Sequence, residues 1–169
     1  MLVGAYLKIV EECEIVAYGQ HSPIEGDQME IDVIGIQPDG NQEIITCEVA
    51  THLGGLGYGN ATKNAERVAS KFTHAEEYVD RTFGKVSHRF QFWSPNVPPA
   101  SETQLNDVAE EFEGRTGTEL ELVINSEYTD RVVSLQKRAE NTVSQRNELA
   151  FRFLQILEHL KPTDKETQK

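Results

Sequence analysis

Two short apolar runs, 29–36 and 42–50, constrain the fold of this chain most, because each encloses one acidic residue. Their composition and the turn 38–41 (Pro-Asp-Gly-Asn) between them predict two neighbouring β-strands. Asp32 lies inside the first run and Glu48 inside the second. A carboxylate in a buried strand is costly unless a partner compensates its charge. A divalent cation between the two carboxylates would offset both their burial and their repulsion, since Mg²⁺ is often held by one or two carboxylates and water.

The length of the chain suits one domain over residues 1–160, followed by a disordered tail over 161–169. The formal net charge of −12 is unusual for a protein that binds nucleic acid. The charge is unevenly spread, because residues 1–59 hold one basic and ten acidic residues, whereas residues 60–100 hold six basic and four acidic ones. A basic surface facing an acidic metal site is one interpretation of this second region. A solvated helix with mixed charges is the other, and it is the commoner explanation of such runs.

Several sequence features bear on the compartment in which the protein works. Cys13 and Cys47 have no CxxC partner, so we expect buried thiols in a reducing compartment rather than zinc ligands or a disulfide. The apolar run at the N-terminus is short and is interrupted by Lys8, which argues against a signal peptide. No apolar run approaches the roughly 20 residues that span a bilayer. These features together predict a cytoplasmic protein.

Hydrophobic periodicity predicts an α/β fold in which helices flank a central mixed β-sheet. The expected helices lie at 2–12, 61–82 and 101–113, and the expected strands at 14–18, 29–36, 42–50, 86–93 and 119–124. Ser101 is expected to cap the third helix, and Gly114 and Gly117 to end it. A C-terminal helical extension follows at about 127–160, in one piece or broken near Asn141. A single helix of that length would be about 50 Å long and could project to form a homodimer with a second copy of the chain.

The segment 54–59 holds four glycines in six residues and leads into a helix with three basic residues on one side. It matches neither the GxxxxGK[ST] nor the GxGxxG pattern. It is therefore either a loop that contacts phosphate or a flexible connection, and we slightly favour the connection. Asn60 is suited to cap the helix. Lys63, Arg67 and Lys71 recur at every fourth position of that helix, which places them on the same side.

Asp32 on one strand, Glu48-Val49-Ala50 on the next, and the order of elements over most of residues 1–124 resemble the PD-(D/E)XK, or restriction-endonuclease-like, nuclease superfamily. The core of that superfamily is a helix, a three-strand meander, a helix and a further strand. The resemblance implies a metal-dependent nuclease that hydrolyses phosphodiester bonds in DNA. It also implies a Mg²⁺ or Mn²⁺ ion held by Asp32 and Glu48, with the Val49 carbonyl as a third ligand.

One position departs from the family pattern, because Ala50 stands where the motif has a lysine. That lysine orients the attacking water and offsets charge, and within the superfamily it is sometimes supplied by the following helix. The resemblance therefore implies Lys63 as the catalytic lysine, although an exposed surface lysine is the usual role of a single helical lysine. Arg67 and Lys71 are then expected to contact the nucleic acid.

Three functions from different classes stay open at this point. The first is an active, divergent metal-dependent nuclease, which the two acids and the basic helix favour. The second is a catalytically degenerate nuclease fold that binds nucleic acid or a protein, which Ala50 and the acidic net charge favour. The third is an unrelated α/β interaction domain. A lysine amine close to both carboxylates would favour the first.

Overall fold

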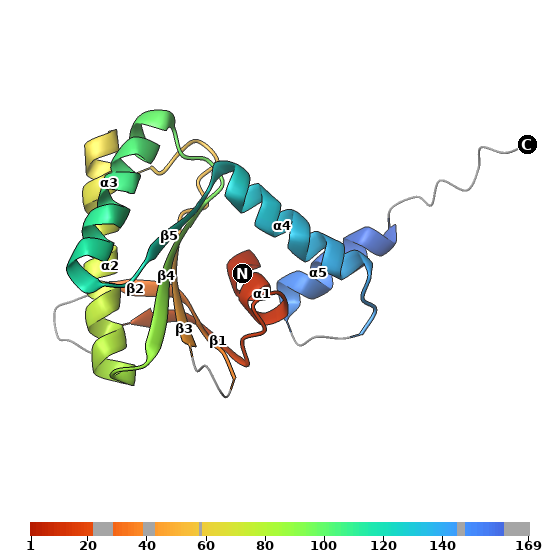
Figure 1. Cartoon of the computed structure of the whole chain (residues 1–169). Helices are drawn as coiled ribbons and strands as arrows, with labels where there is room; N and C mark the ends of the chain where they lie inside the picture. The colour runs from red at the N-terminus through yellow and green to blue at the C-terminus, as the bar shows by residue number, and fades with distance from the viewer. Residues whose placement is uncertain (22–28, 39–42, 58, 145–147, 161–169) are drawn as a thin grey trace, which may run out of the picture.

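A computed structural model describes the chain apart from residues 22–28, 39–42, 58, 145–147 and 161–169. Most of the expected turn at 38–41 and all of the expected tail therefore lie outside the described residues. The described elements form an α/β fold in which helices flank one open sheet, as the sequence predicted (Figure 1).

The five strands are arranged in the order β1-β2-β3-β4-β5, which is also their order along the chain. The first three form an antiparallel meander, and β4 and β5 are each parallel to the strand before them. A parallel neighbour needs a long crossover connection, which α2 and α3 supply. Their bounds are β1 Ile15–His21, β2 Glu30–Ile36, β3 Glu43–Val49, β4 Ser87–Ser94 and β5 Leu120–Ile124. Each expected strand overlaps an observed one.

Helices cover both faces of the sheet, as Figure 1 shows. On one face lie α2 (Ala61–Phe83) and α3 (Pro99–Thr116). On the other lie α1 (Leu2–Ile9) and α4 (Asn125–Glu140), with α5 (Leu149–Leu160) packed against them. The result is a three-layer arrangement with an apolar cluster on each side of the sheet.

The strand β4 shows how one sequence supplies both clusters. Phe90 and Phe92 pack edge-on against Phe72 of α2. Trp93, the next residue, packs against Tyr6 of α1 with a ring-centroid distance of 5.2 Å. Because successive side chains of a strand point to opposite faces, a strand between two helical layers must be apolar on both.

The third helix is longer at both ends than the predicted 101–113, although one of the two glycines expected to end it does so. It starts at Pro99, and among the described residues no side chain caps it. Proline suits the first turn, because its missing N–H would have no partner there. Ser101 is instead buried inside the helix, where its hydroxyl accepts a hydrogen bond from the Asn64 amide at 3.2 Å. Gly114 lies within the helix, and Gly117, with φ of 72°, ends it.

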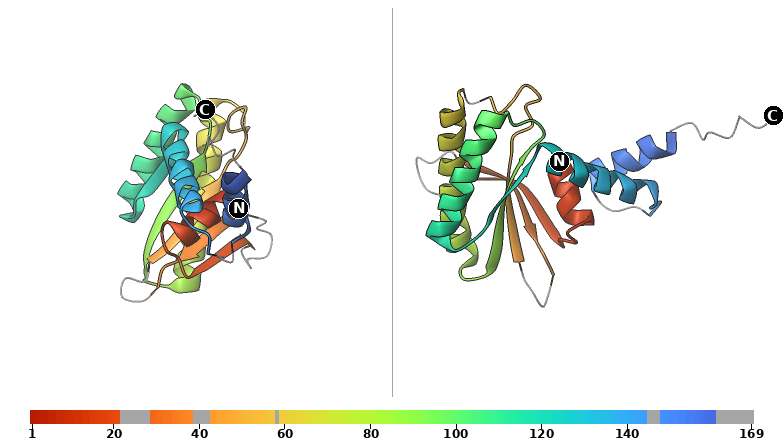
Figure 2. Two further views of the ribbon diagram at one scale, coloured as in Figure 1. Left: turned by 90° about the vertical axis from the view of Figure 1, so that its right-hand side faces the viewer. Right: turned by 45° about the horizontal axis from the view of Figure 1, so that its top comes forward.

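The C-terminal helical extension is in two pieces, and the break lies where the sequence predicted it. Asn141 is the C-cap residue of α4, and α5 starts at Leu149. Glu148 anchors the start of α5, because its carboxylate accepts hydrogen bonds from the Phe151 N–H at 2.8 Å and from the Tyr18 hydroxyl of β1 at 3.1 Å. Both helices project away from the sheet (Figure 2).

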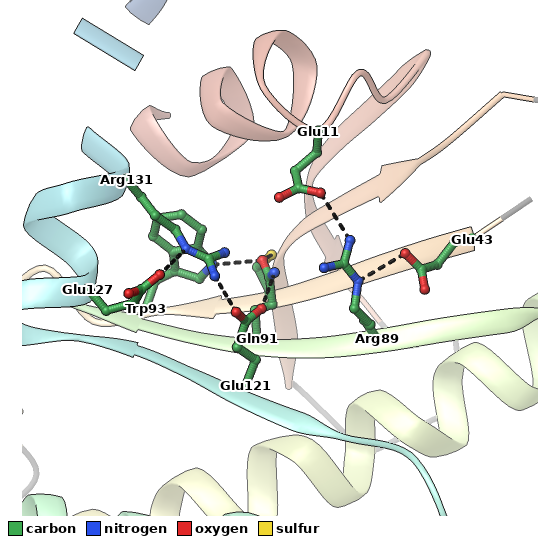
Figure 3. A network of polar contacts seen from close by, with 9 residues as sticks. Glu11, Glu43, Arg89, Gln91, Trp93, Glu121, Glu127 and Arg131 are labelled. Atoms are coloured by element: carbon green, nitrogen blue, oxygen red, sulfur yellow. Dashed lines mark hydrogen bonds and ion pairs between the residues drawn. The ribbon is translucent and has the colours of Figure 1, made fainter. Parts of the chain in front are cut away.

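A polar network holds α4 to the sheet (Figure 3). Arg131 of α4 forms an ion pair with Glu121 of β5, and its guanidinium lies 5.5 Å from the ring centre of Tyr6 and 5.3 Å from that of Trp93. Gln91 donates a hydrogen bond to Glu121 at 2.7 Å and accepts one from the Trp93 indole at 3.0 Å. Charge-assisted bonds of this kind are stronger than neutral ones and fix the position of the helix.

The two cysteines and the apolar content of the helices were also predicted from the sequence. Cys13 and Cys47, both in the described part of the chain, are buried free thiols as predicted. Gly35 leaves room for the first of them, since a Cβ atom there would lie 2.8 Å from the Cys13 sulfur. Within the described residues, no helix is both long enough and apolar enough to cross a membrane.

Candidate functional site

Asp32 and Glu48 lie on adjacent strands, as the sequence predicted. The last residue pair of the β2–β3 ladder is Val33 with Cys47, so the two acids are the next residues outward on their strands. Both project toward α2, since the same lysine of that helix contacts both carboxylates. The acids thus meet at one end of the ladder, on the face that α2 covers.

The lysine is Lys71, from the third turn of α2. Its ammonium group forms an ion pair with Glu48 Oε2 and lies 3.8 Å from Asp32 Oδ2. The Glu48 side chain is 1% exposed and that of Lys71 17%, so this pair is shielded from water. Asp32 is 30% exposed and gives the group an open side. We call these three residues the Asp32–Glu48–Lys71 cluster.

The backbone of Val49 completes this arrangement. Its N–H donates a hydrogen bond of 2.7 Å to Asp32 Oδ2, in place of a ladder bond to β2. The N–H and C=O groups of one strand residue point toward the same neighbouring strand. The Val49 carbonyl therefore points to the side of β3 on which Asp32 lies, which makes it the candidate for a third oxygen ligand.

The electrostatics of the cluster centre on Glu48. Burial raises the pKa of its carboxyl from the ordinary 4.5 to about 7, the Lys71 ammonium opposes this rise, and the Asp32 carboxylate adds to it. The ammonium attracts both carboxylates, which would otherwise repel each other. Glu48 is therefore a buried acid that needs a positive charge in order to stay ionised at neutral pH.

The donor atoms of the cluster fit a hard divalent cation. Two carboxylates and a carbonyl form an all-oxygen set, which Mg²⁺ and Mn²⁺ prefer. Within the described residues, no group of three or more His, Cys, Asp or Glu side chains could hold a metal ion. Two carboxylates are nonetheless enough for Mg²⁺, which usually keeps several water ligands. Asp32, Glu48 and the Val49 carbonyl are the groups that would hold it.

The other two basic residues of the helix lie elsewhere. Lys63 and Arg67 are exposed, and with Glu66 and Ser70 they line an open depression on the outer side of α2. Eight residues of helix separate Lys63 from the cluster lysine, which is about 12 Å along the axis. Among the described residues, Lys63 forms no ion pair with either carboxylate of the cluster. The helix thus brings Lys71, the third of these basic residues, to the acids rather than Lys63, the first.

Ala50 and the glycine-rich segment after it are anchored in the apolar core. Ala50 is buried in the apolar core between α2 and the sheet, and its N–H donates a hydrogen bond of 2.8 Å to the Trp93 carbonyl. Leu56 is buried in the same core. Gly55 and Gly57 flank it with φ of 110° and 78°, which glycine adopts without strain. This anchoring fits the interpretation of the segment as a connection between β3 and α2.

A sequence signal for the position of Lys71 was available in its spacing from apolar residues. Lys71 follows Val68 by three residues and precedes Ala75 by four, so it belongs to the edge of the buried stripe of α2. A lysine there buries its aliphatic stem and brings its ammonium to the margin of the core. Its spacing of eight residues from Lys63 instead led to the prediction that it lies on the same side as Lys63 and contacts nucleic acid.

A scan against protein-family models, a search of curated proteins and a search of solved structures find no match to this chain. The function is therefore argued from the geometry of the Asp32–Glu48–Lys71 cluster and from the order of the elements that position it.

Proposed function

We propose that this protein is a divergent metal-dependent nuclease with a restriction-endonuclease-like core, which hydrolyses phosphodiester bonds in DNA. The observation that carries the proposal is the contact of the Lys71 ammonium with both carboxylates. An acid on each of two adjacent strands and a lysine beside them are the chemical groups that the resembling motif uses. The order α1, β1, β2, β3, α2, β4 supports the proposal, since it matches the expected core.

Each group of the cluster has a role in this proposal. Asp32, Glu48 and the Val49 carbonyl would hold a Mg²⁺ or Mn²⁺ ion. When bound, the ion supplies a water of lowered pKa and neutralises charge on the phosphate. Lys71 takes the role of the missing motif lysine: its ammonium hydrogen-bonds to the attacking water and offsets negative charge at the reacting phosphate. Asp32 is the most exposed member of the cluster, and the proposal has the substrate approach from its side.

The substrate contacts continue along α2. Lys63 and Arg67 are exposed on the outer side of the same helix and provide positive charge for a phosphate backbone. Contacts of this kind position the nucleic acid and carry no sequence information by themselves. The proposal therefore gives Lys63 and Arg67 a binding role and reserves the chemistry for Lys71.

A second candidate is a catalytically degenerate nuclease fold that binds nucleic acid or a protein. Two observations favour it: alanine at the motif lysine position, and a net charge of −12, which repels a polyanion. In that case Lys71 would have a structural role, as the counter-charge of a buried Glu48.

Metal-dependent cleavage tests the first candidate against the second. Wild-type protein should nick plasmid DNA with Mg²⁺ or Mn²⁺ and not with EDTA, and Asp32→Ala should abolish both the cleavage and the heat of metal binding in calorimetry. Glu77→Ala, an exposed acid on the outer side of α2, is the matched control and should change neither. Metal binding that survives in both Asp32→Ala and Glu48→Ala would overturn the site. Metal binding without cleavage of any DNA or RNA would favour the degenerate fold.

A further inference from the structure

An exposed apolar stripe runs along the outer side of α5. Leu149, Phe153, Ile156 and Leu160 are exposed by 75%, 60%, 46% and 73%, although all four are large apolar residues. They are separated by four, three and four residues, which is the spacing of the contact positions in a coiled coil. We call these four residues the α5 seam. Such a seam is typical of a helix that packs against another helix.

The opposite side of α5 is already occupied. Phe151 is fully buried against α1 and α4, and Leu154 packs against the same cluster. Gln155 is buried beside them and donates a hydrogen bond to the Ser144 carbonyl at 3.2 Å. The helix is thus fixed on one side by its own domain, and the seam is the surface that it presents outward. A helix held in this way loses little conformational freedom when a partner packs against it.

Charge favours a second copy of this chain as the partner. Residues 1–124 hold eight basic and 21 acidic residues, so two such bodies repel each other. In contrast, α4 holds three basic and three acidic residues, and α5 holds one of each. These two helices project from the sheet (Figure 2), so contact through them brings the neutral part of one copy to that of the other. A membrane is a poorer partner, because an interfacial helix that binds anionic lipid needs an excess of basic residues.

We propose that two copies of the chain associate through their α5 seams as an antiparallel, two-fold symmetric helix pair. In this arrangement Phe153 of one copy lies opposite Ile156 of the other, and Leu149 lies opposite Leu160. The start of α5 lies beside α1 and its end points away from the sheet (Figure 1). An antiparallel pair therefore places the two acidic bodies at opposite ends, whereas a parallel pair would place them side by side.

A groove at the base of α5 adds to the contact. Apolar side chains, among them those of Met1, Ile15 and Leu149, line it together with the charged side chains of Lys8, Glu14 and Glu148. The antiparallel pairing brings Leu160 of the second copy to this groove. The seam itself offers several hundred Å² of apolar surface, less than the roughly 800 Å² per partner of a standard stable interface. The dimer is accordingly weak, with a dissociation constant on the order of tens of micromolar.

Sedimentation velocity of the full chain tests this association. The weight-average mass of the wild type should rise with concentration from the monomer value of 19.0 kDa toward twice that value. Phe153→Glu should raise the dissociation constant at least about 30-fold, because it places a charge in the seam. Leu53→Glu, which changes an apolar residue that is 81% exposed and lies outside both helices, is the control and should behave as wild type.

A mixing experiment tests the pairing itself. Phe153→Glu and Ile156→Lys should each be monomeric and should associate when mixed, since the proposed pairing brings the glutamate opposite the lysine. Circular dichroism should show both variants folded, because both positions lie on the exposed side of α5. The proposal is overturned if the wild type stays monomeric at all concentrations, binds phospholipid vesicles as a monomer, or dimerises equally well as Phe153→Glu. It is also overturned if the mixture does not associate.

Discussion

Glu48 makes the stability of the metal-free protein depend on pH. Because burial raises its pKa from 4.5 to about 7, the folded chain holds a proton between these values that the unfolded chain releases. The free energy of unfolding should therefore fall as the pH rises through this window, by at most about 3 kcal/mol. Chemical denaturation with EDTA at about pH 5 and about pH 8 measures the change. Glu48→Gln should lack this pH dependence of the free energy of unfolding. If Glu48→Gln instead shows the same pH dependence as the wild type, the pKa of Glu48 is not raised in the folded protein.

Lys71 should stabilise the fold most strongly where Glu48 is ionised. Lys71→Met leaves a buried carboxylate without its counter-charge, which typically costs about 3–5 kcal/mol. The loss should be larger at about pH 8 than at about pH 5, since at low pH the carboxyl takes up a proton instead. The double variant with Glu48→Gln should recover much of the loss, because it replaces the pair by two neutral side chains of similar size. Lys63→Met is the control and should change the free energy of unfolding by less than about 0.5 kcal/mol. Equal losses of stability in Lys71→Met and Lys63→Met would contradict the pairing of Lys71 with Glu48.

At the scale of elements, the attachment of α4 to the sheet depends on Arg131. Its guanidinium pairs with Glu121 and lies over two aromatic rings, so Arg131→Met leaves the Glu121 carboxylate without its cation in a half-buried position. We expect a loss of about 2–4 kcal/mol in the free energy of unfolding, measured by urea denaturation. Arg138→Met, at an exposed position of the same helix, should have almost no effect. If Arg131→Met and Arg138→Met lower the free energy of unfolding by the same amount, the network of Figure 3 contributes little to stability.

The elements were largely predictable from the sequence, because periodicity reports burial directly. The α2 stripe with Val68 and Phe72 is buried as expected. The break near Asn141 falls in the stretch 136–148, which has only two apolar residues, Ala139 and Val143. The start of α3 was missed, because Ser101 has the chemistry of a cap although a proline two residues earlier already opens the helix. The contacts of Arg131 could not be predicted, because its partners come from distant parts of the chain.

The candidate site was predictable in part. Two acids inside apolar runs conflict with burial, and that conflict indicated Asp32 and Glu48 without any coordinates. The register of β2 and β3 confirms that they lie on adjacent strands. Which lysine reaches them depends on how α2 crosses the sheet, and helical spacing alone does not determine that crossing. Lys63 and Lys71 are eight residues apart, so their side chains leave the helix about 80° apart around its axis. Among the described residues, only Lys71 contacts the carboxylates, whereas Lys63 lies on the outer side of α2.

For the whole molecule, the distribution of charge sets the conditions of its proposed function. The body is strongly acidic, and the exposed basic side chains of Lys63 and Arg67 lie on the same helix as the lysine that contacts the two carboxylates. A divalent metal would therefore serve both the chemistry and the approach of a polyanionic substrate, since it lowers the local negative charge. The proposed nuclease activity requires that Lys71 replace the lysine missing at position 50.

Moving the lysine tests that claim most directly, by the rate of metal-dependent cleavage of a DNA substrate. We expect Lys71→Ala to lower the rate at least about 100-fold, the usual contribution of a positioned acid–base group, and Lys63→Ala to keep it within a few-fold of wild type. We also expect Ala50→Lys to restore part of the activity in the Lys71→Ala background, because position 50 shares a strand face with Glu48. A Lys71→Ala variant that cleaves as fast as wild type would contradict the account.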